Sequence, residues 1–182
     1  MTSLRRRRHP GVLPFGPHRP RIAPSAFLAP GVWIVGEVTV ERDASVWFGA
    51  VIRGDAGPIV VGPETLVEDN VVMHGQVTTG QACVLGHGAV LHGCVVGDRV
   101  VIGSQAVVFN ATIGEGSIVA IGSVVYPGTV VPPSTIFRNG PATNEPRVEP
   151  VGDRLKAWDA EFYQGLIATY RGIRAKGRTR RD

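Results

Sequence analysis

Aliphatic residues recur along the middle of the chain with a period of six. Between Leu28 and Phe137, almost every sixth position carries Val, Ile, Leu or Met. These positions form four phased runs: Leu28, Ile34, Val40, Val46 and Ile52; Val61, Val67, Met73, Thr79, Leu85 and Leu91; Val96, Ile102 and Val108; Ile113, Val119, Val125, Val131 and Phe137. A period of six fits neither the 3.6-residue repeat of an amphipathic helix nor the two-residue alternation of a half-buried strand. It is typical of solenoids, in which short strands are joined by tight turns.

Three hexads make one coil of such a solenoid, so each hexad forms one side of a triangular prism. The aliphatic residue is expected to point inward and to stack on its equivalent eighteen residues later. A small residue often follows four positions later, as at Val32, Ala50 and Ala89, where the chain turns. We therefore predict an all-β domain over residues 22–140, a parallel β-helix of about six coils with capped ends.

The two ends of the chain have a different pattern. Residues 1–21 are rich in Pro and Arg and are predicted to be disordered or draped over the surface. Residues 141–152 are predicted to be an extended connector with three prolines. Apolar residues at spacings of three and four then predict one amphipathic helix over residues 153–175, capped by Asp153 and followed by a basic tail, residues 176–182.

The net charge of +4 hides an asymmetry. Residues 1–21 carry six arginines and no acidic residue, and residues 174–182 carry five basic residues and one acidic residue. The body of the chain is therefore net acidic, which argues against nucleic-acid binding by the folded part. No apolar run is long enough to span a membrane. Two cysteines, Cys83 and Cys94, are expected to be small buried thiols, as is usual for a cytoplasmic protein.

Three of the five histidines, His74, His87 and His92, fall within nineteen residues. His74 and His92 each follow an inward aliphatic residue, and they are one full coil of eighteen residues apart. Both side chains are therefore predicted to project outward from the same side of the prism, at the spacing of about 4.8 Å between stacked strands. Two imidazoles at this spacing can share one metal ion.

His87 follows the inward Leu85 by two positions, which places it near a turn on another side of the prism. It is not expected to reach the point where the other two histidines converge within one chain. In a threefold trimer, however, the His87 of one subunit can meet the His74 and His92 of a neighbour. This geometry predicts one metal site at each subunit boundary. Three histidines with an open position for water form the pattern of a catalytic zinc site.

Three segments of the chain resemble the γ-class carbonic anhydrases and their γ-carbonic-anhydrase-like relatives. These are residues 46–55, which contain Arg53-Gly54-Asp55; residues 67–74, which lead to His74; and residues 86–94, which contain His87 and His92. The resemblance extends over about residues 22–175. Hexapeptide repeats alone are shared by many acyltransferases, so the combination of the three segments carries the resemblance.

The resemblance implies a left-handed sense of coiling, opposite to that of ordinary parallel crossovers. It also implies a homotrimer with Zn²⁺, or alternatively Fe²⁺ or Co²⁺, held between subunits by His74, His87 and His92. The implied reaction is the reversible hydration of carbon dioxide to bicarbonate by a metal-bound hydroxide. Arg53 and Asp55 are then expected to form a charged pair near the subunit boundary, with Arg53 able to attract bicarbonate.

The chain departs from the family pattern at two places. Glu68 stands where the family commonly has Gln, and it is either a proton acceptor for metal-bound water or a plain outward charge. Ala56 and Gln76 stand where the best-characterised members carry acidic residues that shuttle protons. Metal binding is therefore a firmer expectation than fast turnover.

Two other classes of function remain open. A hexapeptide-class acyltransferase uses one histidine as general base and needs a groove for a thioester, whereas this chain has only a short insertion near Gly57-Pro58 and has three clustered histidines. A non-enzymatic, metal-binding scaffold could use the helix 153–175 and the basic tails to dock partners.

Overall fold

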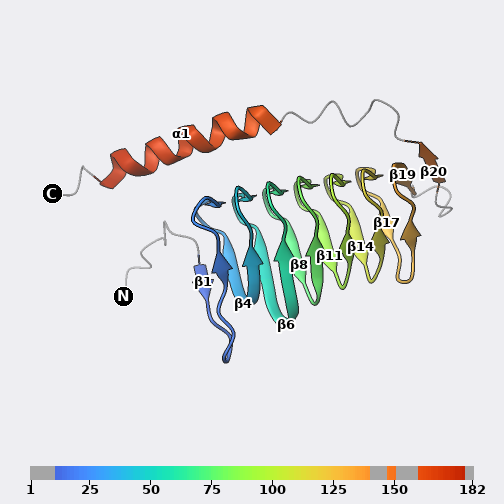
Figure 1. The fold of residues 1–182 in the computed structure, drawn as a ribbon, viewed down its shortest axis with the longest axis horizontal. Helices are drawn as coiled ribbons and strands as arrows, with labels where there is room; N and C mark the ends of the chain where they lie inside the picture. Colours follow the sequence, from blue (N-terminus) through green and yellow to red (C-terminus); the bar gives the residue numbers. More distant parts are fainter. Residues whose placement is uncertain (1–10, 140–146, 151–159, 179–182) are drawn as a thin grey trace, which may run out of the picture. The chain divides into compact units, whose positions relative to one another are not determined.

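The computed structural model describes residues 11–139, 147–150 and 160–178. Short parallel strands wind around a common axis and form the three sides of a prism (Figure 1). Each side is a stack of strands from successive coils, because strands pair in parallel with those of the coil before and the coil after, apart from one antiparallel strand at the C-terminal end. The predicted β-helix, followed by one α-helix, is confirmed.

The first side contains seven strands in spatial order: β1 (Gly11–Leu13), β4 (Trp33–Val40), β6 (Val51–Val61), β8 (Val72–His74), β11 (Val90–His92), β14 (Val107–Phe109) and β17 (Val124–Val125). On the second side lie β2 (Arg21–Ile22), the C-terminal halves of β4 and β6, β9 (Val77–Thr79), β12 (Val95–Val96), β15 (Thr112–Ile113) and β18 (Val130–Val131). Because β4 and β6 run through the corner without a break, these two sides form one bent 12-stranded sheet.

The third side is an 8-stranded sheet. It consists of β3 (Phe27–Leu28), β5 (Ser45–Val46), β7 (Leu66–Val67), β10 (Val84–Leu85), β13 (Val101–Ile102), β16 (Ile118–Val119), β19 (Thr135–Arg138) and β20 (Arg147–Pro150). The core lies between the three sides, where the residues of the six-residue repeat meet. On the first side, one inward ladder is fully buried and in register: Ile34, Ile52, Met73, Leu91, Val108 and Val125.

The β-helix begins earlier than the predicted boundary at residue 22. Strand β1 pairs with the start of β4, and the Gly11 N–H donates to the Val32 carbonyl at 2.6 Å. Gly11 lies directly on the Trp33 ring, so that a Cβ at this position would be 2.3 Å from a ring carbon. The Pro- and Arg-rich composition suggested an unpaired segment, but this close approach of a glycine to an aromatic ring joins residues 11–13 to the first coil.

The far end of the β-helix is closed by an antiparallel strand. Strand β20 lies in the segment predicted to be an extended connector, and it pairs antiparallel with β19. This pairing covers the last open edge of the third side, which would otherwise be an unpaired strand edge. On the first side, the Asn139 carboxamide caps the edge of β17 by accepting from the Val124 N–H at 2.7 Å and donating to the Val124 carbonyl.

Helix α1 (Ala160–Arg178) forms a unit separate from the β-helix. The predicted helix start at Asp153 lies outside the described residues, and the helix continues three residues past the predicted end at 175. Among the described residues, no helix combines the length and apolar character that crossing a bilayer requires.

Candidate metal centre

His74 and His92 end two adjacent strands of the first side, β8 and β11. The strands pair so that His74 lies opposite His92, directly after the buried Met73 and Leu91. The two imidazole centroids are 5.2 Å apart and the rings are tilted by 47°. The predicted stacking of these histidines one coil apart is therefore what the structure contains.

A carboxylate and a guanidinium brace the His74 ring. The Asp55 Oδ1 lies 3.2 Å from the His74 Nε2. Arg53 donates to the other Asp55 oxygen from its Nε at 3.0 Å and from its Nη2 at 2.8 Å. These hydrogen bonds from Arg53 lower the pKa of Asp55, so that its carboxylate stays ionised. A histidine that ligates a metal usually presents its other ring nitrogen to such a carboxylate.

The His92 ring is enclosed by a phenyl ring on one side and a turn on the other. The Phe109 ring stacks on it with centroids 4.4 Å apart and planes 10° from parallel. Gly75 has φ = +72° and lies close to the imidazole, where a Cβ would be 3.1 Å from the Cε1 of His92. The turn after His74 therefore favours glycine, both for its left-handed backbone and for the space that His92 occupies.

His87 lies in the turn between β10 and β11, next to two acidic residues. The Oε2 of Glu68 is 3.2 Å from the His87 Nε2 and also accepts the backbone N–H of His87 at 3.0 Å. The Oδ2 of Asp69 is 3.3 Å from the His87 Nδ1. Glu68 is only 2% exposed, whereas the His87 ring is about half exposed. Each nitrogen of His87 thus faces a carboxylate, and one of these contacts must be exchanged if the ring ligates a metal.

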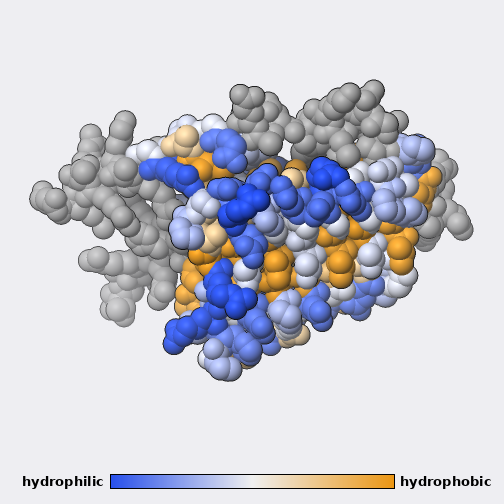
Figure 2. Space-filling model, in the orientation of Figure 1, coloured by the Kyte–Doolittle hydropathy of each residue, from blue (hydrophilic) through white to orange (hydrophobic). Residues whose placement is uncertain are grey.

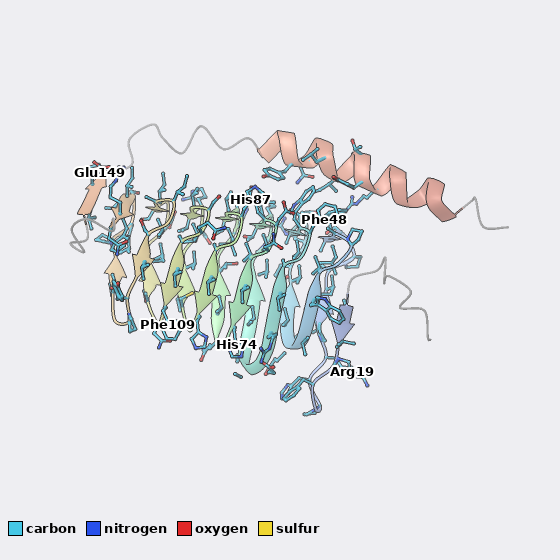
Figure 3. The ribbon with its side chains drawn as sticks, turned by 180° about the vertical axis from the view of Figure 1, so that it is seen from behind. Arg19, Phe48, His74, His87, Phe109 and Glu149 are labelled. Atoms are coloured by element: carbon cyan, nitrogen blue, oxygen red, sulfur yellow. The ribbon has the colours of Figure 1, made fainter. Side chains whose placement is uncertain are left out.

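The third histidine lies at a different corner of the prism from the other two. Figure 3 shows His74 and Phe109 along one edge of the β-helix and His87 at the opposite edge. An extended segment of five residues, such as that from His87 to His92, is long enough to separate its ends by roughly 16 Å. Two histidine nitrogens that share a metal must each lie about 2.1 Å from it, so the two corners are too far apart for one shared ion. Within the described part of the chain, no three His, Cys, Asp or Glu side chains are arranged to hold a metal. A three-histidine centre therefore needs a second copy of the chain.

Known proteins are similar to this chain in sequence and in fold. No protein-family model matches the chain. The chain is 40% identical over 89 residues to the mitochondrial γ carbonic anhydrase 3 of Arabidopsis thaliana, with 43% of the chain and 34% of that protein covered. It is 42% identical over 83 residues to a protein of Methanocaldococcus jannaschii named as a probable carbonic anhydrase, with 43% and 52% covered. The chain thus spans a third to a half of the length of these relatives.

Solved structures match over nearly the whole chain. A hexapeptide transferase family protein from Anaplasma phagocytophilum has a TM-score of 0.79 at 29% identity, with 89% of this chain and 97% of that one covered. A Bacillus cereus protein provisionally assigned as an acetyltransferase has a TM-score of 0.76 at 30% identity, with 87% and 93% covered. The chain belongs to the γ-carbonic-anhydrase-like family of hexapeptide-repeat proteins.

In this γ-carbonic-anhydrase-like protein, a hollow opens beside His92. It is lined by Ala56, Gly75, Gln76, His92, Gly93, Val95 and Asn110. The two positions at which acidic residues were expected from the family pattern, Ala56 and Gln76, therefore both face this hollow. None of its lining residues is acidic, so the hollow offers carboxamides and small apolar groups beside the imidazole.

Sequence reasoning missed two residues of this candidate site. Asp69 follows Glu68 directly, and its Oδ1 accepts the Phe48 N–H at 3.0 Å while its other oxygen faces His87. Phe109 lies opposite His92 on the next strand. The coil spacing is the signal that could have found Phe109, since it lies seventeen residues after His92, in a coil shortened by one residue.

Proposed function

We propose that this protein catalyses the reversible hydration of carbon dioxide to bicarbonate at metal sites shared between the subunits of a homotrimer. His74 and His92 of one subunit and His87 of a neighbouring subunit hold one divalent metal. Three imidazoles suit Zn²⁺, Fe²⁺ and Co²⁺, and Zn²⁺ is the first candidate.

One observation carries this proposal. Two imidazoles lie in register with centroids 5.2 Å apart, while the third histidine is exposed at another corner. His74 and His87 are each in contact with carboxylates that can orient a ligating ring. Neither part makes a complete centre alone, and a cyclic trimer repeats the same contact three times so that every subunit contributes both parts.

A row of valines on the first side supports contact between subunits. Val51, Val72, Val90, Val107 and Val124 are in register on successive strands, and all are at least partly exposed. In Figure 2, hydrophobic residues extend along the β-helix between hydrophilic margins. An uncharged row of this kind beside the two histidines is typical of the apolar centre of a subunit interface.

The residues around the histidines divide the chemistry between two subunits. When bound, the metal supplies the Lewis acidity that brings the pKa of water near 7. Asp55 keeps His74 in one orientation, and the half-exposed Arg53 guanidinium offers a positive charge to an anionic product. Glu68 comes with His87 and is the buried carboxylate placed to take up a proton beside the site.

We expect this chemistry to be slow. The residues that line the hollow beside His92 include Ala56 and Gln76 and none that is acidic, so this hollow offers no carboxylate to pass on a proton. A proton that Glu68 takes up must then pass to buffer without a second proton-carrying group in this hollow. External buffer at high concentration is expected to raise the rate.

Metal analysis followed by stopped-flow measurement of carbon dioxide hydration tests the proposal. We expect about one metal per subunit and measurable hydration, both of which are lost in His92→Ala. A matched control is Tyr126→Leu, which changes an exposed aromatic residue beyond the histidine pair. Full metal binding and hydration by His92→Ala would rule out the proposed site.

A second candidate is acyl transfer, because two solved structures that match nearly the whole chain are described as transferases. Such an enzyme would use one of the histidines as general base. Incubation with acetyl-coenzyme A and a panel of amines or alcohols distinguishes the two. Release of free thiol by a metal-free sample would favour transfer, whereas bound metal without either reaction would favour a scaffold.

A further inference from the structure

The three candidate ligands are not held in the same way. His74 lies against Asp55, and His87 lies against Glu68 and Asp69. Within the described residues, the His92 ring has neither a hydrogen bond nor an ion pair. Its orientation must therefore come from packing.

The packing partner is Phe109. Strands β11 and β14 pair so that Phe109 lies opposite His92, and the rings are 4.4 Å apart and nearly parallel. A stack on the face of an imidazole leaves the edge uncovered, where both nitrogens lie. Phe109 lies on the imidazole although it is 39% exposed.

We propose that Phe109 is the positioning residue of His92, replacing with its ring face the carboxylate that orients each of the other two histidines. The inference rests on the proposed function, since it assumes that His92 ligates a metal. An imidazole that can rotate loses this freedom when it binds a metal, and a ring that is already held loses less. Removal of the phenyl ring should therefore weaken metal binding while the donor atoms remain unchanged.

The test compares Phe109→Leu, which removes the aromatic face, with Phe109→Tyr, which retains it. The matched control is Tyr126→Leu, an exposed aromatic residue one coil further on. Affinity for Zn²⁺ and Co²⁺ is measured by competition with a chelator. We expect Phe109→Leu to weaken binding about tenfold, the lower end of the loss typical of residues that orient ligands. Phe109→Tyr and Tyr126→Leu should stay within about twofold of the unmodified protein.

A second measurement needs no metal. In metal-free protein with ¹³C-labelled histidine, the stacked phenyl ring should shift the His92 ring-proton resonances upfield. Phe109→Leu should move them back toward ordinary values, while Phe109→Tyr should not. Thermal unfolding of each variant identifies any that fails to fold.

The outcomes separate this inference from the proposed function. An unmodified protein that binds no metal refutes both. If the unmodified protein binds metal and Phe109→Leu binds it equally well, only the positioning role is refuted. Absence of the upfield shift in the unmodified protein, or a loss in Phe109→Tyr as large as in Phe109→Leu, also overturns it.

Discussion

Mixed trimers provide the sharpest test of a site shared between subunits. His87→Ala removes the ligand from one corner of the prism, and His92→Ala removes a ligand from another. Each variant alone should bind no metal and have no hydration activity. In a trimer containing both variants, some boundaries pair an intact His74–His92 pair with an intact His87, and only these boundaries can form a complete site.

The expected recovery follows from the geometry. With equal amounts of two variants that assemble at random, half of the subunits supply an intact His74–His92 pair and half of the neighbours supply an intact His87. About one boundary in four is then complete, so activity and metal content should approach about a quarter of the unmodified values. The variants are unfolded and refolded together, and the unseparated trimers are measured by stopped flow. In mixed trimers isolated with two different affinity tags, one boundary of the three is always complete, so recovery there should be about a third of the unmodified values.

A matched pair of variants serves as control. His74→Ala and His92→Ala both damage the same half of the site, so no boundary in their mixed trimers is complete and no activity should return. Recovery in this control, or no recovery in mixed His87→Ala and His92→Ala trimers, would refute the shared site. Folding of each variant is checked by thermal unfolding, because His87 also contacts the buried Glu68.

Three further predictions concern single positions. Gly75→Ala should lower the free energy of unfolding by about 1–2 kcal/mol, because alanine is strained in the left-handed backbone, and should also weaken metal binding, because its Cβ would press on His92. The control is Gly128→Ala, since Gly128 has a similar φ of +80° and nothing within 4 Å of an added Cβ. Chemical denaturation should show a similar loss of stability for this control, with metal binding unchanged. Burial raises the pKa of the Cys94 thiol to about 12, so this thiol should react with a disulfide reagent only after unfolding. The stability that the buried neutral thiol contributes should be complete below pH 9 and should be lost as the pH rises toward 12. The pKa of Asp55 lies below its ordinary value of 3.8, so the stability that its carboxylate contributes is present above pH 4 and is lost as the pH falls through the lowered pKa. In urea titrations, the free energy of unfolding should therefore fall less between pH 5 and pH 3 for Asp55→Asn than for the unmodified protein.

The repeat predicted most of the fold because each coil contacts only its neighbours. In such a fold, spacing along the chain translates directly into position in space. The separation of eighteen positions from His74 to His92 was therefore enough to predict that the two rings face the same way, and the register of β8 and β11 agrees.

The ends of the β-helix were harder to predict, because they break the repeat. The first coil depends on Gly11 packing against the Trp33 ring, and the last edge depends on β20 turning back onto β19. Neither segment has a hexad pattern of its own. Contacts with the first and last regular coils decide both conformations, so composition alone suggested disorder at one end and a plain connector at the other.

By itself, the sequence determined the coil, the direction of each aliphatic side chain and the pairing of His74 with His92. All of these follow from a period that the chain repeats locally. Only the tertiary structure decided which side chains orient the histidines: Asp55 beneath His74, Glu68 and Asp69 beside His87, and Phe109 on His92. These contacts join different coils, and insertions and one-residue slips set their exact register, so they depend on how far each coil is displaced from the ideal repeat.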